Sequence, residues 1–171
     1  MIFVLNLILT IIINDKIDQI NKLTSLAEKS FMNKNYIESI KNYKTLIDSL
    51  DYSNEKVFLN LAHAHLLSSD TLNAIENYNL ASLTENNKIK SIAFQQLGNI
   101  NEKNNKLNEA LNFYKESIIA DNENNDSKFN YELVKKKLEQ EKNQQNKEKD
   151  NSKENQKKNQ SENKTQYKEG Q

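Results

Sequence analysis

The sequence contains no cysteine, no proline, no tryptophan and only two glycines. Without cysteine the chain can form no disulfide, thiolate metal site or cysteine nucleophile, and it offers no cysteine for lipid attachment. All 24 basic residues are lysine, and 24 acidic residues balance them to a net charge of zero. A chain of this charge lacks the basic surface on which nucleic-acid binding depends. The absences therefore exclude thiol chemistry and argue against a nucleic-acid partner.

The sequence also lacks the motifs that mark common active sites. It has no phosphate-binding loop, no HExxH zinc motif and no glycine-rich dinucleotide turn. The two histidines, His63 and His65, would point about 200° apart on a helix, so they cannot share one metal ion. The sequence therefore predicts a non-catalytic protein with no cofactor and no metal site.

A threefold helical pattern is what the sequence does contain. The copies begin and end 20 residues apart, and they are Leu23 to Tyr43, Phe58 to Tyr78, and Phe94 to Tyr114. Small residues recur inside the copies in two columns, which are Ala27, Ala62 and Gly98, and Ser39, Ala74 and Ala110. Small residues are needed where two helices touch closely, so we expect Gly98 to be a point of close approach. A fixed unit joined by variable loops indicates a helical repeat array.

The pattern resembles the tetratricopeptide repeat (TPR), whose units place an aromatic residue, Leu-Gly, alanine and a second aromatic residue in this order. The resemblance covers about Asn21 to Asn125. The sequence departs from it by having no proline and by placing Ser39 at the middle alanine position of the first copy. The resemblance implies an all-α fold, an α-solenoid of three TPR helix pairs followed by a C-terminal capping helix.

The apolar spacing predicts seven helices within a repeat domain of residues 15–140. We expect them at about residues 15–33, 35–50, 54–67, 71–83, 88–103, 107–120 and 129–140. The last of these would cover the exposed end of the array, as terminal repeats require. In it we expect Phe129, Leu133 and Leu138 to point inward.

Two terminal segments lie outside this domain. Residues 1–14 are apolar at first and too short to span a membrane comfortably, since a spanning helix needs about 20 apolar residues. Their length suits a secretory signal, so we expect a protein of the periplasm or the membrane-associated cell envelope. The alternatives are a helical extension packed on the first repeat and a cytoplasmic protein. Residues 141–171 contain no aliphatic side chain and are predicted to be a disordered low-complexity tail.

The TPR resemblance implies a concave groove lined by the first helix of each pair. In the register of the family, His63 lies on this concave face and His65 packs in the core. The implied groove residues are Thr24, Glu28, Phe31 and Met32 in copy one, Leu59, His63, Leu66 and Leu67 in copy two, and Gln95, Asn99, Glu102 and Lys103 in copy three. Copies one and two offer apolar side chains, which are typical of a site for a partner segment. Chaperone-type TPRs hold a carboxylate with Lys and Asn where this chain has Thr24 and Glu28, so we do not expect that clamp here.

A narrower resemblance concerns the junction between the repeats and the tail. Residues 129–136, FNYELVKK, precede a tail rich in Lys, Gln, Asn and Glu. This junction is similar to that of the short exported TPR proteins of Bat (aerotolerance) operons. The resemblance implies a protein-interaction scaffold in a bacterial cell-envelope complex, with membrane-anchored von Willebrand A-domain proteins as partners. The alternative is a cytosolic TPR adaptor or a structural spacer without a specific peptide ligand.

Overall fold

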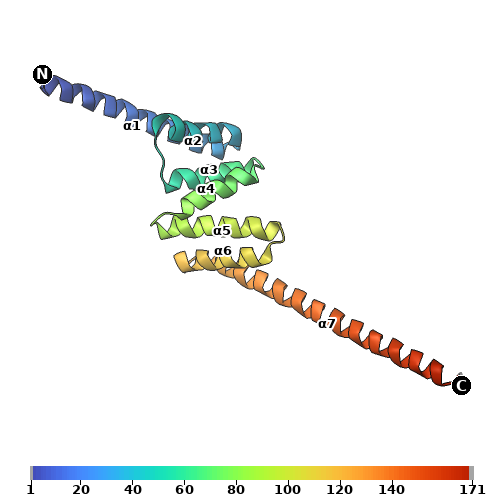
Figure 1. Ribbon diagram of the computed structural model, residues 1–171. Coiled ribbons are helices and arrows are strands. Elements are labelled where there is room, and N and C mark those ends of the chain that lie inside the picture. The colour runs from blue at the N-terminus through green and yellow to red at the C-terminus, as the bar shows by residue number, and fades with distance from the viewer. Residues whose placement is uncertain (1, 170–171) are drawn as a thin grey trace.

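Stacked pairs of antiparallel helices make up the computed structural model, which describes the backbone of residues 2–169 and the side chains of residues 13–145, 147 and 148. The helices of this part are α1 (Ile2–Met32), α2 (Tyr36–Leu50), α3 (Glu55–Leu67), α4 (Thr71–Ser82), α5 (Asn87–Lys103), α6 (Leu107–Ala120) and α7 (Asn125–Glu169). Each helix packs on the next one along the chain. Figure 1 shows α1 and α7 projecting from opposite ends of the stack. The predicted all-α solenoid of three pairs and a capping helix is confirmed.

Polar residues, rather than proline and glycine, separate the helices. Five helices begin at an Asn or Asp whose side chain accepts a hydrogen bond from the backbone N–H three residues later. These N-caps are Asn35, Asn54, Asp70, Asn86 and Asn124. The chain also turns through left-handed backbone conformations at Lys34, Asp51, Ser69 and Asn105, where φ lies between 48° and 68°. Short polar side chains can terminate helices in this way, so the missing prolines do not disturb the repeat.

One buried tyrosine lies at the centre of each helix pair, and the three tyrosines form a column along the array. Tyr43, Tyr78 and Tyr114 are each at most 1% exposed. Opposite Tyr114, a Cβ atom on Gly98 would lie 2.6 Å from the Tyr114 Cε1 atom, which is closer than real Cβ atoms approach. Gly98 is thus the predicted point of close approach between α5 and α6. In the first pair, the Ser39 hydroxyl donates to the Ala27 carbonyl oxygen at 2.9 Å, which explains how serine serves at an alanine position.

The inward face of α7 differs from the prediction. Phe129 is 68% exposed and Leu133 is 38% exposed, whereas Val134 is fully buried and Leu138 packs beside it. The N-cap of α7 explains the shift, because Asn124 accepts from the Ser127 backbone N–H at 3.0 Å. The helix therefore starts earlier than residue 129 and turns Ser127 into the core. Of the three predicted inward residues, only Leu138 packs against the core.

A network of buried hydroxyls holds α7 in this register. The Ser117 hydroxyl lies 2.9 Å from the Ser91 hydroxyl and 2.7 Å from the Ser127 hydroxyl. The Asn124 amide donates to Ser91 at 3.0 Å. All three serines are fully buried, and buried polar groups are costly unless they are hydrogen-bonded. The network therefore favours one placement of α7 against α5 and α6.

Several apolar side chains of the first pair are exposed. They are Ile17 at 48%, Leu26 at 41% and Ile37 at 72% exposed. α1 and α2 form the first pair, so no earlier described pair covers their outer side. The inner side holds the residues that pack as predicted, including Leu23, Ile40 and Leu46.

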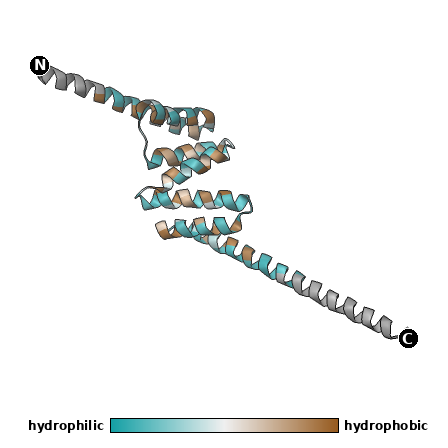
Figure 2. Ribbon diagram, viewed as in Figure 1, coloured by the Kyte–Doolittle hydropathy of each residue, from teal (hydrophilic) through white to brown (hydrophobic). Residues whose placement is uncertain are grey.

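The two end helices are longer than predicted. α1 begins at Ile2 rather than near residue 15, and α7 continues to Glu169 although residues 141–171 were expected to be disordered. Neither stretch contains proline, and glycine is absent before residue 170 in the second, while Lys, Glu and Gln are good helix formers. Figure 2 shows hydrophobic positions on α7 beside α6 giving way to hydrophilic ones farther out. The helix thus continues on backbone propensity without an apolar stripe.

The role of the N-terminal apolar segment in export is not tested by the described residues. No helix in the described part of the chain is long and apolar enough to cross a membrane. The side chains of residues 1–12, on which the export prediction rests, lie outside the described residues. Export therefore stays a prediction.

We predict that Gly98→Ala destabilises the protein although alanine is the better helix former by about 1 kcal/mol. The added methyl group would overlap the buried Tyr114 ring, and overpacking of this kind typically costs about 1–3 kcal/mol. Urea unfolding followed by circular dichroism measures the change. Asn108→Ala, at an exposed position of α6, serves as the control for helix propensity. Equal or higher stability of Gly98→Ala would show that the α5–α6 contact is not tight.

Candidate functional site

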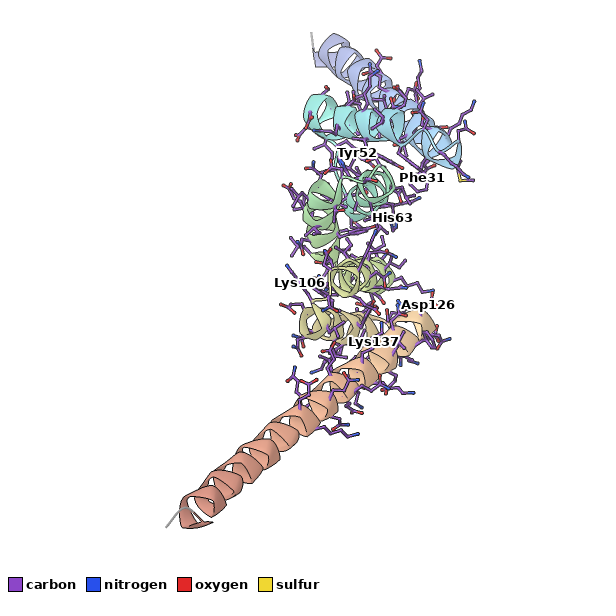
Figure 3. All side chains as sticks on the ribbon, turned by 90° about the vertical axis from the view of Figure 1, so that its right-hand side faces the viewer. Phe31, Tyr52, His63, Lys106, Asp126 and Lys137 are labelled. Carbon is purple, nitrogen blue, oxygen red and sulfur yellow. The ribbon has the colours of Figure 1, made fainter. Side chains whose placement is uncertain are left out.

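A cavity opens between the first and second repeats, on the side of the stack formed by the first helix of each pair. Its volume is about 290 Å³, and its lining residues are Glu28, Phe31 and Met32 of α1, Tyr43 of α2, and Asn60 and His63 of α3. Figure 3 labels Phe31, near the end of α1, and His63, on the neighbouring helix α3. The site thus combines residues from two repeats.

The polar floor of this cavity is formed by Tyr43, Asn60 and His63, and the hydroxyls of two core tyrosines hold Asn60 and His63 in place. The Asn60 amide donates to the Tyr43 hydroxyl at 3.1 Å. The His63 Nδ1 atom lies 2.7 Å from the Tyr78 hydroxyl, and the two rings meet edge to face with centroids 5.3 Å apart. Burial raises the pKa of both tyrosine hydroxyls and lowers the pKa of His63. The floor is therefore uncharged at neutral pH.

The rim is apolar apart from one carboxylate. Phe31 packs edge to face against Tyr36 with centroids 5.6 Å apart, and Met32 is 79% exposed. The Glu28 carboxylate lies 3.9 Å from the Lys56 ammonium group, and the two side chains are 46% and 69% exposed. An exposed ion pair of this length contributes little, typically 0–1 kcal/mol. The rim therefore presents apolar atoms beside a carboxylate that solvent reaches.

The structure brings together most of the groove residues predicted in the first copy. Glu28, Phe31 and Met32 line the cavity with His63, as expected for one concave surface. Thr24 lines a smaller neighbouring cavity of about 140 Å³, and its hydroxyl donates to the Ile20 carbonyl oxygen at 2.8 Å. Leu67 is 52% exposed and follows His63 by four residues, which places it on the same helix face.

Leu59 is a correction to the predicted groove. It is only 6% exposed and belongs to the core cluster with Tyr78 and Leu97. The reason is that α3 also contacts α5, the first helix of the next pair, so residues on that side of α3 are covered. Leu66 packs partly against the same cluster. Neither residue is a free apolar anchor.

The groove positions of the third copy are engaged by α7. The Asn124 amide donates to Gln95 Oε1 at 3.0 Å, and the Asn130 amide donates to Asn99 Oδ1 at 3.2 Å. Farther along the helix, Lys137 pairs with Glu102. The Lys103 side chain is exposed. α7 therefore takes up hydrogen-bonding groups that the sequence suggested for a partner.

Sequence reasoning missed two residues of the cavity, Asn60 and Tyr43. Asn60 is a polar residue in an otherwise apolar part of α3, and it lies three residues before His63 on the same face. This spacing between Asn60 and His63 is the signal in the sequence from which Asn60 could have been predicted as a residue of the site. Tyr43 gave no comparable signal, because it repeats with Tyr78 and Tyr114 as a buried core residue, although it also lines the cavity.

His65 is buried, as predicted for a core residue, at 7% exposure. Its Nδ1 atom lies 2.9 Å from a carboxylate oxygen of Asp70. Hydrogen bonds from Asn73 lower the pKa of the Asp70 carboxyl, and His65 adds to that effect. Because Asp70 is the N-cap of α4, this pair fixes the turn between α3 and α4. The described residues hold no cluster of three His, Cys, Asp or Glu side chains suited to a metal ion.

The fold is a stack of antiparallel helix pairs around buried tyrosines. Several solved structures have a similar fold. The Sgt2 TPR domain from Aspergillus fumigatus superposes with a TM-score of 0.62 at 24% identity, over 72% of this chain and 82% of that chain. The first TPR of Spaghetti (RPAP3), bound to the HSP90 peptide SRMEEVD, gives 0.61 at 21% identity over 71% and 94%. The Yersinia enterocolitica type III secretion chaperone SycD, in complex with a peptide of the translocator YopD, gives 0.63 at 17% identity over 71% and 95%.

These likenesses show that the chain has the fold of TPR domains, as its repeat pattern predicts. No protein-family model and no curated protein matches the sequence.

We predict that His63 makes the protein less stable as the pH falls below its ordinary pKa of 6.5. Burial lowers the folded-state pKa, so the unfolded chain binds more protons and stability is lost on acidification, by up to about 1.4 kcal/mol per pH unit. The loss levels off below the folded pKa. The groups around His63 are Tyr78, Tyr43 and Glu28. Urea unfolding between pH 5 and pH 8 should show a shallower slope for His63→Gln, and parallel slopes would contradict this account.

Proposed function

We propose that this protein is a non-catalytic interaction scaffold that holds an extended segment of a partner protein in the concave groove of its first two repeats. The observation that carries this proposal is the cavity between α1 and α3, where Phe31 and the exposed Met32 stand beside uncharged hydrogen-bonding groups. Concave, largely apolar sites with a few placed polar groups suit a peptide ligand. The third repeat is a poorer site, since α7 engages Gln95 and Asn99.

Proteins of the same fold support a peptide ligand. The SycD structure contains a peptide of YopD, and the RPAP3 structure contains the HSP90 peptide SRMEEVD. A structure of PcrH contains the chaperone-binding region of PopB. The ligand class is thus shared by domains that differ from one another in the segment they bind.

The proposed setting is the bacterial cell envelope. The apolar residues 2–13 have the length of a secretory signal. The junction at residues 129–136 is similar to that of the exported TPR proteins of Bat operons, whose partners are membrane-anchored von Willebrand A-domain proteins. We propose the same class of partner here, with a cytosolic adaptor as the alternative.

The groove is tested by making its exposed apolar side chains polar without changing charge. A peptide that binds the wild-type protein is first selected from a display library. The double variant Met32→Gln, Leu67→Gln should bind this peptide about tenfold or more weakly, because both apolar contacts are removed. The matched control is the double variant Leu72→Gln, Leu83→Gln. These two residues are 83% and 78% exposed, and they belong to α4 and its C-cap, on the second-helix side of the second pair. Fluorescence anisotropy with a selected peptide measures the affinity, and circular dichroism verifies the fold.

Retention of binding in the groove variant would overturn the proposed site. Loss of binding in both double variants would show that the effect is not specific to the groove. Leu59 is unsuitable for this test, because a polar residue at a site only 6% exposed would unfold the array.

Export is tested separately with a reporter enzyme that is active only outside the cytoplasm. Fusion after Lys16 should give activity, because residues 2–13 would carry the reporter across the membrane. The control fusion lacks residues 2–13 and should be inactive. An inactive full fusion would favour the cytosolic adaptor.

A further inference from the structure

Taking the groove as the partner site, we infer that its pocket selects a segment in which a bulky apolar side chain neighbours a lysine or arginine. This inference rests on the proposed function and adds the chemistry of the partner. The six residues that line the cavity carry it, together with Lys56 at its edge.

The shape of the cavity calls for an apolar side chain. Phe31 is held in place by its edge-to-face contact with Tyr36, whereas Met32 is largely exposed. Methionine is unbranched and adapts to the shape of a ligand. A fixed aromatic wall with a flexible neighbour accommodates side chains such as Leu, Met or Phe within a cavity of about 290 Å³. Burying such a side chain removes apolar surface from water and thereby favours binding.

The charge of the cavity calls for a cation beside that side chain. Glu28 is the one charged residue among the six that line it. Its present partner, Lys56, stands 3.9 Å away in an exposed pair and lines the neighbouring cavity instead. A lysine or arginine of the partner can therefore replace Lys56 at little cost. Its aliphatic stem can lie along the apolar rim while its charge stays at the carboxylate.

An acidic segment finds no counterpart in this cavity. Among the residues that line the cavity, only His63 could become a cation, and burial keeps it neutral by lowering its pKa. A carboxylate placed there would face Glu28, and like charges brought together at an interface are unfavourable. The pocket thus suits a partner of opposite charge to SGPTIEEVD, the acidic peptide without Lys or Arg that is bound to the second TPR domain of human RPAP3.

The floor of the cavity suits the main chain of an extended segment. Asn60 uses its amide N–H groups toward the Tyr43 hydroxyl, which leaves its carbonyl oxygen as an acceptor at the cavity wall. Tyr43 accepts in that contact, so its own hydrogen can be donated. An acceptor and a donor from adjacent side chains match the N–H and C=O of one peptide group. A segment held in this way would place alternate side chains toward the cavity.

The test is a selection of random displayed peptides on the full chain, on Glu28→Gln and on Glu28→Lys. The control is Glu116→Lys, which makes the same charge change at an exposed position of α6. Peptides selected on the wild type should pair an apolar residue with Lys or Arg. The affinity of the best peptide, measured by anisotropy, should fall about tenfold in Glu28→Gln and further in Glu28→Lys. It should be unchanged in Glu116→Lys, and the acidic peptide SGPTIEEVD, which contains no Lys or Arg, should compete at least about tenfold more weakly.

The outcomes separate this inference from the proposed function. If wild-type peptides are acidic, or if Glu28→Lys binds the best peptide as well as the wild type does, the inference is overturned while the groove remains a peptide site. If no peptide is enriched on the wild type, both proposals fail. Because Glu28 is exposed, all variants should fold, and the conservative Glu28→Gln excludes a general effect of charge reversal.

Discussion

The close contact between the two helices of each pair is the constraint on which the array depends. In the third pair, the Tyr114 ring fills the space that a side chain at position 98 would need. Tyr43 and Tyr78 stand at the same place in the first two pairs and are equally buried. In a solenoid each pair contacts only its neighbours, so the spacing within one pair sets how the next pair can stack. A change at this contact would propagate as altered curvature before it caused unfolding.

The same tyrosines connect the core to the concave surface. Each ring is buried, yet each hydroxyl meets a side chain of a first helix: Tyr43 with Asn60, Tyr78 with His63, and Tyr114 with Asn99 and Glu102. The hydroxyls fix the orientation of those side chains, as a buried polar network does when it is satisfied. The tyrosine hydroxyls of the core therefore preorganise the side chains of the groove, which reduces the entropy cost of ordering them when a ligand binds.

The repeat and most helix limits follow from the sequence, because they rest on local rules. Apolar spacing locates α2 to α6 within a residue or two, and Asn or Asp side chains mark the starts of α2 to α5. The site was harder to predict, because it depends on which helix covers which. Leu59 is buried by α5, a contact between helices that are not consecutive in the chain. The engagement of Asn99 by Asn130 depends in turn on the register of α7, which the buried Ser127 determines. Neither fact is encoded in the spacing of a single helix.

The engagement of the third repeat by α7 limits how long a recognised segment can be. With α7 bonded to Gln95, Asn99 and Glu102, the open groove extends over the first two repeats only. Adjacent packed helices lie about 10 Å apart, so the open stretch is on the order of 20 Å. An extended chain covers about 3.3–3.6 Å per residue, which corresponds to about six residues. A motif this short occurs by chance in many proteins, so the choice of partner must also depend on where and when the two chains meet.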